Sequence, residues 1–163
     1  MTVNLLLAGC GKMGGALLGG WLGGDVAAGD VAVVEPFAGD DVKQRFGVSV
    51  VEAIDAVADS FVPDIVVFAV KPQNMDEILP LYRHYVRPET VFLSIAAGRT
   101  IASFEKYLGE AAAIIRTMPN TPAAIGRGIT VACGNQPVTD SQRALAQSLL
   151  ESRKFCDCPQ KGF

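Results

Sequence analysis

The sequence lacks the features of nucleic-acid-binding proteins, of membrane-spanning proteins and of zinc-binding proteins. It has no basic cluster, and its 14 Lys and Arg against 17 Asp and Glu give a formal net charge of −3, which argues against a nucleic-acid surface. No stretch supplies the roughly 18 uncharged apolar residues of a membrane span. The four cysteines show no C-x-x-C spacing and no zinc quartet with His84, the single histidine. We therefore expect no nucleic acid, no membrane, no metal, and a cytoplasmic location.

We also expect no secretory signal at the start of the chain. Leu7-Ala8-Gly9-Cys10 looks like the cleavage box of a bacterial lipoprotein, but such a signal needs a positive start and an apolar stretch of about 7–15 residues. The first four residues carry no positive side chain, and only residues 5–8 are continuously apolar before the box. The lipoprotein interpretation therefore fails, and a second pattern must explain these residues.

Short apolar runs alternate along the chain with longer amphipathic segments. Four of the strand runs are almost uninterrupted, as is typical of strands buried on both faces. The alternation predicts an α/β fold, a single domain with a doubly wound, mostly parallel, Rossmann-like sheet. The predicted strands are residues 3–8, 31–35, 48–50, 65–70, 91–95, 113–118 and 129–133, and the predicted helices are residues 13–22, 40–46, 52–59, 75–86, 101–108 and 140–151.

The spacing Gly9-x-Gly11-x-x-Gly14 is typical of a turn that holds a dinucleotide pyrophosphate. It follows a predicted strand, opens a predicted helix, and has Glu35 at the end of the second strand, about 20 positions on. Gly9 allows the tight turn, Gly11 lets the backbone approach the pyrophosphate, and Gly14 lets helix and strand pack closely. The helix N-terminus offers N–H groups to the phosphates. The alternatives are a turn that binds nothing and, for Lys12, a solvated lysine instead of a phosphate contact.

Glu35 also bears on the choice of cofactor. A carboxylate at this position can accept hydrogen bonds from ribose hydroxyls and repels a 2′-phosphate. Asp40 and Asp41 follow it, while Lys43 and Arg45 lie further into the predicted helix. The charges therefore favour NADH over NADPH, unless Glu35 simply points to solvent.

Three further stretches lie at the carboxyl ends of predicted strands, where open α/β sheets bind their ligands. They read FAVKPQ (68–73), SIAAG (94–98) and RTMPNTPAAIGRG (116–128). Together with the first turn they closely resemble pyrroline-5-carboxylate reductase, and the resemblance runs from about residue 3 to residue 150. Members of that family reduce the C=N bond of a cyclic imino acid to give proline, by hydride transfer from NADPH or NADH.

The resemblance implies a cofactor site built from several segments. The first turn would bind the pyrophosphate, Glu35 would face the adenosine ribose, and the residues after the fourth and fifth strands would contact the nicotinamide side. Asn120 and Thr121 could hydrogen-bond the carboxamide or the substrate carboxylate, or belong to a structural turn. The implied cofactor-binding residues are Ala8, Gly9, Cys10, Gly11, Lys12, Met13, Gly14, Glu35, Ala69, Val70, Lys71, Pro72, Ala96, Ala97, Gly98 and Asn120.

The chain departs from the family's pattern at its C-terminal end. The family continues into a helical domain that forms the dimer and supplies much of the imino-acid pocket, whereas residues 153–163 form an atypical tail after a dinucleotide-binding domain of residues 1–152. No side chain is a convincing proton donor, and His84 is interpreted as a solvated surface residue. We therefore expect an NAD(P)H-dependent reductase by family, inactive as an isolated chain and weakly self-associating. The alternatives are another small NAD(P)-dependent reductase and a non-catalytic dinucleotide-binding module.

Overall fold

The computed structural model describes residues 2–96, 98–119, 130–150 and 155–157. The chain forms two compact units, residues 1–70 and residues 71–163. Each unit is described by itself. No helix in the described ranges is both long and apolar enough to cross a lipid bilayer.

The first unit contributes four parallel strands in the spatial order β3 (Ser49–Val51), β2 (Val31–Val34), β1 (Leu5–Ala8) and β4 (Ile65–Phe68). All residues of β1, β2 and β4 are buried. This burial explains their unbroken apolar sequences, because a strand covered on both faces has no solvent side to mark with polar residues.

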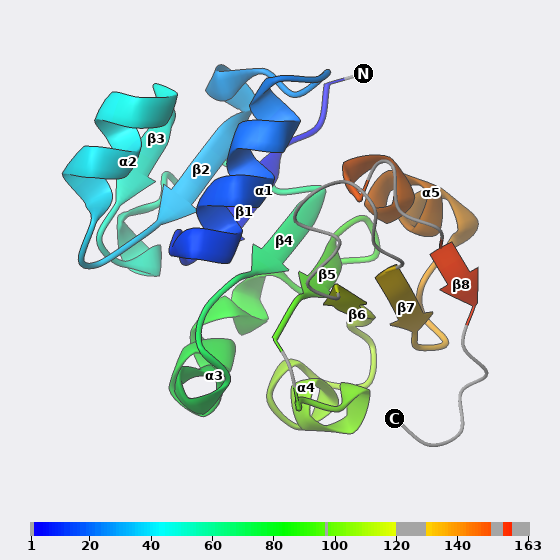
Figure 1. The fold of residues 1–163 in the computed structure, drawn as a ribbon. Helices are drawn as coiled ribbons and strands as arrows, with labels where there is room; N and C mark the ends of the chain where they lie inside the picture. Colours follow the sequence, from blue (N-terminus) through cyan, green and yellow to red (C-terminus); the bar gives the residue numbers. More distant parts are fainter. Residues whose placement is uncertain (1, 97, 120–129, 151–154, 158–163) are drawn as a thin grey trace. The chain divides into compact units, whose positions relative to one another are not determined.

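Two helices accompany the strands of the first unit (Figure 1). Helix α1 (Lys12–Leu22) follows β1 and buries Leu17, Leu18 and Trp21, which share one side of the helix because they are spaced by one, three and four residues. Helix α2 (Gly39–Phe46) follows β2 and ends at Gly47, whose φ is +67°. Both connections run from a strand directly into a helix, as the predicted alternation requires.

The second unit contributes β5 (Val91–Ser94), β6 (Ala113–Pro119), β7 (Thr130–Gly134) and β8 (Phe155–Asp157). The pairs β5–β6 and β7–β8 are parallel, and β6–β7 is antiparallel. The predicted α/β fold with a mostly parallel sheet is therefore confirmed. Strand β8 lies in the predicted tail, and the other residues of that tail lie outside the described ranges.

Polar side chains cap the N-termini of two helices in the second unit. Helix α4 (Ile101–Leu108) starts at Thr100, whose hydroxyl accepts a hydrogen bond from the Ser103 N–H. Helix α5 (Asp140–Leu149) starts with a capping box between Thr139 and Gln142. Each cap satisfies backbone groups that the first turn of a helix leaves without partners.

Two predicted helices differ from the structure. The predicted helix over residues 75–86 is α only in α3 (Met75–Ile78), and a 3-10 helix, η4 (Leu79–Tyr85), follows. Pro80 has no N–H to donate to the carbonyl four residues earlier, which explains the change. The predicted helix over residues 52–59 is only a 3-10 turn, η2 (Ile54–Ala56), which ends where Val57 takes an extended backbone. The other predicted bounds agree within two residues.

Candidate functional site

The turn between β1 and α1 is crowded at two of its glycines. Gly9 has φ +86°, and a Cβ there would lie 2.8 Å from Val70 Cγ1. A Cβ on Gly14 would lie 2.7 Å from the carbonyl oxygen of Gly9 and 3.2 Å from Ala69 Cβ. Real Cβ atoms do not approach so closely. The predicted tight turn at Gly9 and the close packing at Gly14 are therefore confirmed.

The space around Gly11, in contrast, is open. It is the N-cap of α1, it is exposed, and a Cβ built on it meets no atom within 4 Å. It provides no side-chain cap, and the first turn of α1 contains no acidic residue. The N–H groups of that turn therefore keep their hydrogen-bonding capacity and the positive end of the helix dipole. An anion such as a phosphate can bind there.

Glu35 directly follows β2, and its side chain is buried, with 8% exposed. Its Oε2 accepts a hydrogen bond from the Cys10 N–H at 2.8 Å. Its Oε1 accepts from the N–H groups of Phe37 at 3.0 Å and Ala38 at 3.3 Å. The alternative that Glu35 simply points to solvent is wrong. Its contact with a ribose stays a prediction.

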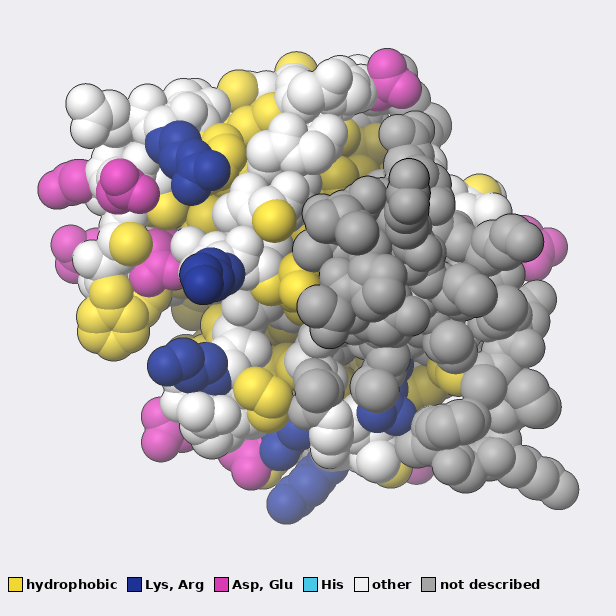
Figure 2. Space-filling view, in the orientation of Figure 1, with side chains coloured by type: hydrophobic (Ala, Val, Ile, Leu, Met, Phe, Trp, Pro, Cys, Tyr) yellow, Lys and Arg dark blue, Asp and Glu magenta, His cyan; other side chains and the backbone are white. Residues whose placement is uncertain are grey.

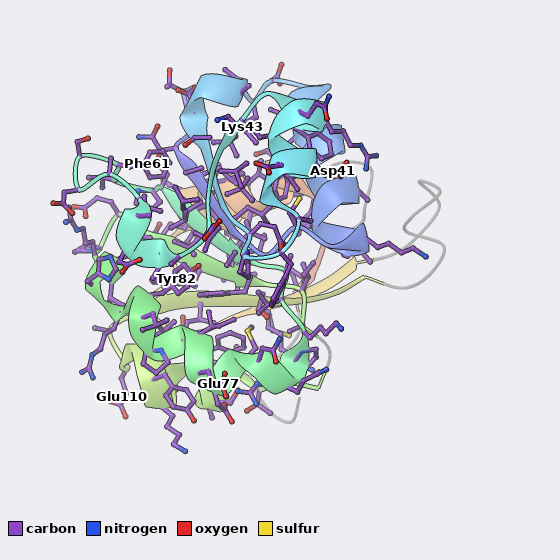
Figure 3. All side chains as sticks on the ribbon, turned by 90° about the vertical axis from the view of Figure 1, so that its left-hand side faces the viewer. Asp41, Lys43, Phe61, Glu77, Tyr82 and Glu110 are labelled. Carbon is purple, nitrogen blue, oxygen red and sulfur yellow. The ribbon has the colours of Figure 1, made fainter. Side chains whose placement is uncertain are left out.

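A cavity of about 340 Å³ opens beside Glu35 at the carboxyl ends of β2 and β3. Four carboxylates line it together with Lys43, so its charge is mainly negative. The ring of Phe37 is 95% exposed at its wall. Figure 3 shows Asp41 and Lys43 on α2. The lining residues are Glu35, Pro36, Phe37, Ala38, Gly39, Asp40, Asp41, Lys43, Val50, Val51 and Glu52.

Sequence reasoning found Glu35 but missed most of this wall. Lys43, which the sequence places further into the helix after Glu35, also lines the cavity. Phe37 could have been noticed as an aromatic residue two positions after Glu35. Val50 and Val51 could have been found because carboxyl ends of neighbouring parallel strands meet at one edge of a sheet.

Cys10 contributes its backbone to the turn and keeps its thiol buried, with 7% exposed. Burial raises the pKa of the Cys10 thiol to about 11, and the nearby charge of Glu35 adds to the effect. The thiol therefore stays protonated near neutral pH, and it is not an activated nucleophile.

The predicted nicotinamide-side residues fall in separate parts of the chain. In the first unit, the Ala69 N–H donates to the Ala8 carbonyl at 2.8 Å, so the chain after β4 runs beside the glycine turn. In the second unit, Lys71 is exposed and Pro72 opens a 3-10 turn, η3 (Pro72–Asn74).

The other predicted residues of the second unit follow β5. The Ala96 N–H donates to Ser94 Oγ at 3.2 Å, and Gly98 is exposed with φ +74°. Ala97 and Asn120 lie outside the described residues. Their predicted roles, like those of all the cofactor-binding residues, stay predictions.

Two further expectations concern the surface. His84 is exposed on η4, as predicted, with its ring centroid 4.0 Å from that of Tyr85. On the described part of the face in Figure 2, Lys and Arg side chains occur at several places, with acidic side chains close to many of them. Within the described ranges, no three His, Cys, Asp or Glu side chains gather as metal ligands.

Residues 4–98 match the family model described as NADP oxidoreductase, coenzyme F420-dependent. The chain belongs to this family. The matched residues contain the glycine turn, Glu35 and the segment after β4. The family model therefore covers the geometry described above for the first unit.

Pyrroline-5-carboxylate reductases are among the relatives of this chain. The chain is 35% identical over 154 residues to that of Pseudomonas aeruginosa, covering 93% of the chain and 55% of the relative. It is 37% identical over 148 residues to that of Escherichia coli, covering 88% and 54%. The predicted resemblance is confirmed, and the chain spans about half the length of these relatives.

A solved pyrroline-5-carboxylate reductase from Coxiella burnetii has the same fold. The two match with a TM-score of 0.87 at 25% identity, covering 99% of this chain and 60% of the other. The predicted Rossmann-like fold is confirmed.

Proposed function

We propose that the chain is the cofactor-binding part of an NAD(P)H-dependent pyrroline-5-carboxylate reductase. The observation that carries this proposal is the open N-terminus of α1 beside the buried Glu35 and its cavity. The resemblance and the relatives support the reaction, which is reduction of the C=N bond of a cyclic imino acid to give proline. The substrate is accordingly a small molecule.

The residues of the first unit fit a dinucleotide. The uncapped turn from Ala8 to Gly14 would hold the pyrophosphate, because Gly11 leaves room for a ligand at the helix N-terminus. The cavity beside Glu35 would hold the adenosine, with the exposed Phe37 ring against the base. When bound, the cofactor supplies the hydride.

The remaining predicted contacts belong to the nicotinamide end. By resemblance, Ala69 to Pro72, Ala96 to Gly98, and Asn120 would line it. We further propose that residues 1–152 act as one dinucleotide-binding domain and that the chain associates weakly with itself. We also propose a cytoplasmic location, where thiols such as that of Cys10 stay reduced.

Gly11 offers the sharpest test of the binding turn. Because a Cβ built on Gly11 meets no atom within 4 Å, Gly11→Val should leave the fold intact and block the approach of the pyrophosphate. Isothermal titration calorimetry with NADH should show saturable binding by the unchanged chain and at least a tenfold loss in Gly11→Val. Gly20→Ala, an exposed position on the same helix with equally open space, is the control and should bind normally. Normal NADH binding by a folded Gly11→Val protein would contradict the assignment.

The reductase and the non-catalytic module differ in turnover. The chain is assayed alone and after fusion to the part of the Pseudomonas aeruginosa relative beyond the matched region, with the imino acid and either reduced cofactor. Cofactor oxidation by the fused protein supports the reductase. NADH binding without oxidation in the fusion supports the non-catalytic module, and oxidation only with a different substrate class supports another reductase.

A further inference from the structure

The carboxylate of Glu35 holds backbone N–H groups of two different loops. We propose that Glu35 is a positioning residue, which fixes the glycine turn in its phosphate-binding conformation before the cofactor arrives. This inference rests on the proposed function and extends it. It adds a task to Glu35 that is separate from any contact with the ribose.

Glu35 is itself well anchored. Its backbone N–H donates to the Val51 carbonyl at 2.9 Å, which extends the pairing of β2 with β3. From there its Oε2 reaches the N–H of Cys10, the residue between Gly9 and Gly11, at 2.8 Å. The neighbouring Gly9 N–H donates to the Val34 carbonyl at 2.9 Å. The turn is therefore tied to the end of β2 by two successive N–H groups.

The glycine turn needs such a tie. Glycine loses more conformational freedom on ordering than any other residue, and Gly11 has no side chain with which to cap its own helix. A hydrogen bond to a buried carboxylate is charge-assisted and stronger than a neutral one. Ordering a loop in advance lowers the cost of binding and so raises affinity.

The acceptor capacity of the carboxylate is already largely used. A carboxylate has about four acceptor sites, and the N–H groups of Cys10, Phe37 and Ala38 occupy three of them. A glutamine at this position has one carbonyl oxygen, and its amide nitrogen is a donor. Glu35→Gln cannot keep all three bonds, and any bond that it keeps to the Cys10 N–H is neutral instead of charge-assisted and therefore weaker.

A ligand without ribose hydroxyls separates positioning from ribose contact. The probes are ADP and 2′,3′-dideoxyadenosine 5′-diphosphate, which share the base and the diphosphate. Calorimetric affinities are measured for the full chain and for Glu35→Gln. If Glu35 positions the turn, the substitution weakens the dideoxy ligand about tenfold and ADP by at least that factor. If Glu35 only contacts the ribose, the dideoxy ligand binds equally well to both proteins, and the proposal is overturned.

Amide hydrogen exchange gives an independent readout by NMR. In Glu35→Gln the Cys10 N–H should exchange at least tenfold faster, while the N–H groups of β1 keep their protection. Val57→Ala is the control for general loss of stability, because Val57 is buried in the same unit but lies outside the turn and the cavity. It should leave both affinities unchanged. Unchanged Cys10 exchange in Glu35→Gln overturns the proposal. If the unsubstituted chain binds neither ADP nor NADH, the proposed function is overturned together with this inference. Measurements on the unsubstituted chain alone therefore distinguish this outcome from a failure of the positioning role.

Discussion

At the residue scale, Gly9 and Gly47 share a left-handed backbone but differ in their surroundings. Both have positive φ, yet a Cβ on Gly9 would meet Val70 Cγ1 at 2.8 Å, whereas a Cβ on Gly47 meets nothing within 4 Å. Gly47→Ala should therefore cost about 1 kcal/mol from backbone strain alone. Gly9→Ala should cost about 3 kcal/mol, because crowding adds to that strain. Urea unfolding measures both, and equal losses would contradict the role of crowding.

The raised pKa of the Cys10 thiol predicts slow alkylation. A thiol with a pKa of about 11 is mostly protonated at pH 8, and only the thiolate reacts. Iodoacetamide should therefore label Cys10 on the order of 100-fold more slowly in the folded chain than in urea, where its pKa returns to about 8.5. The folded rate should rise with pH up to about pH 11. Peptide mass spectrometry follows this residue separately, and comparable rates in both states would refute the assigned burial.

The residues of the glycine turn could be predicted from the sequence, but the partners of Glu35 could not. Gly9 and Gly14 carry a recognisable spacing, and their steric roles follow from having no side chain. Glu35, in contrast, binds backbone N–H groups, which every residue except proline possesses. No sequence pattern marks Cys10 or Phe37 as a donor, so only the folded chain shows that the carboxylate is occupied.

At the scale of elements, Asn135 connects β6 to the segment after β7. Its Oδ1 accepts from the Ile114 N–H at 2.9 Å, and its Nδ2 donates to the Ala112 carbonyl at 2.8 Å and to Glu105 Oε1 at 3.1 Å. Asn135→Ala should lower the free energy of unfolding by about 2–3 kcal/mol, because buried backbone groups lose their partners. Thermal and urea unfolding measure the loss.

Two variants sharpen this test. Asn135→Asp keeps the acceptor for Ile114 but places a carboxylate beside Glu105, so it should also destabilise the chain at neutral pH. Gln136→Ala, at the exposed neighbouring position, should change stability by less than about 0.5 kcal/mol. A similar small change in Asn135→Ala would show that this network contributes little.

The elements themselves were predictable where one signal dominates. Buried parallel strands appear as unbroken apolar runs, and caps such as Thr139 mark where a helix begins. The prediction of one helix over residues 75–86 is wrong because Pro80 removes a backbone donor in the second turn, which the spacing of apolar residues does not reveal. The helix over residues 52–59 was wrong because spacing alone does not distinguish a short helix from a single 3-10 turn.

At the scale of the whole molecule, the charge around the cavity predicts the choice of cofactor. Glu35, Asp40, Asp41 and Glu52 line it together with Lys43, so a 2′-phosphate meets a net negative field. NADPH should bind about tenfold more weakly than NADH at low salt. Raising the ionic strength from about 0.05 M to about 0.5 M should narrow this difference, because salt screens exposed charges. Calorimetry at both salt concentrations checks it, and tighter binding of NADPH at low salt would show that Lys43 dominates.

More of the overall fold than of the site could be predicted from the sequence. The alternation of strands and helices predicts a sheet whose connections follow known crossover rules. The motifs at the strand ends were sufficient to recognise the family. The walls of the cavity were not predictable, because Phe37 follows β2 and Val50 lies on β3, and the two line one cavity only after β2 and β3 pair.

Trp21 gives the chain a built-in optical marker. It is the single tryptophan of the sequence, it is buried at 5% exposure, and it lies on α1, the helix that begins at the glycine turn. Tryptophan emission therefore reports on the first unit alone, whereas far-ultraviolet circular dichroism records helices of both units. If the two signals change at the same urea concentration, the halves unfold in a single transition. If emission changes first, the half that carries the glycine turn opens independently, and saturating NADH should shift that earlier transition in particular.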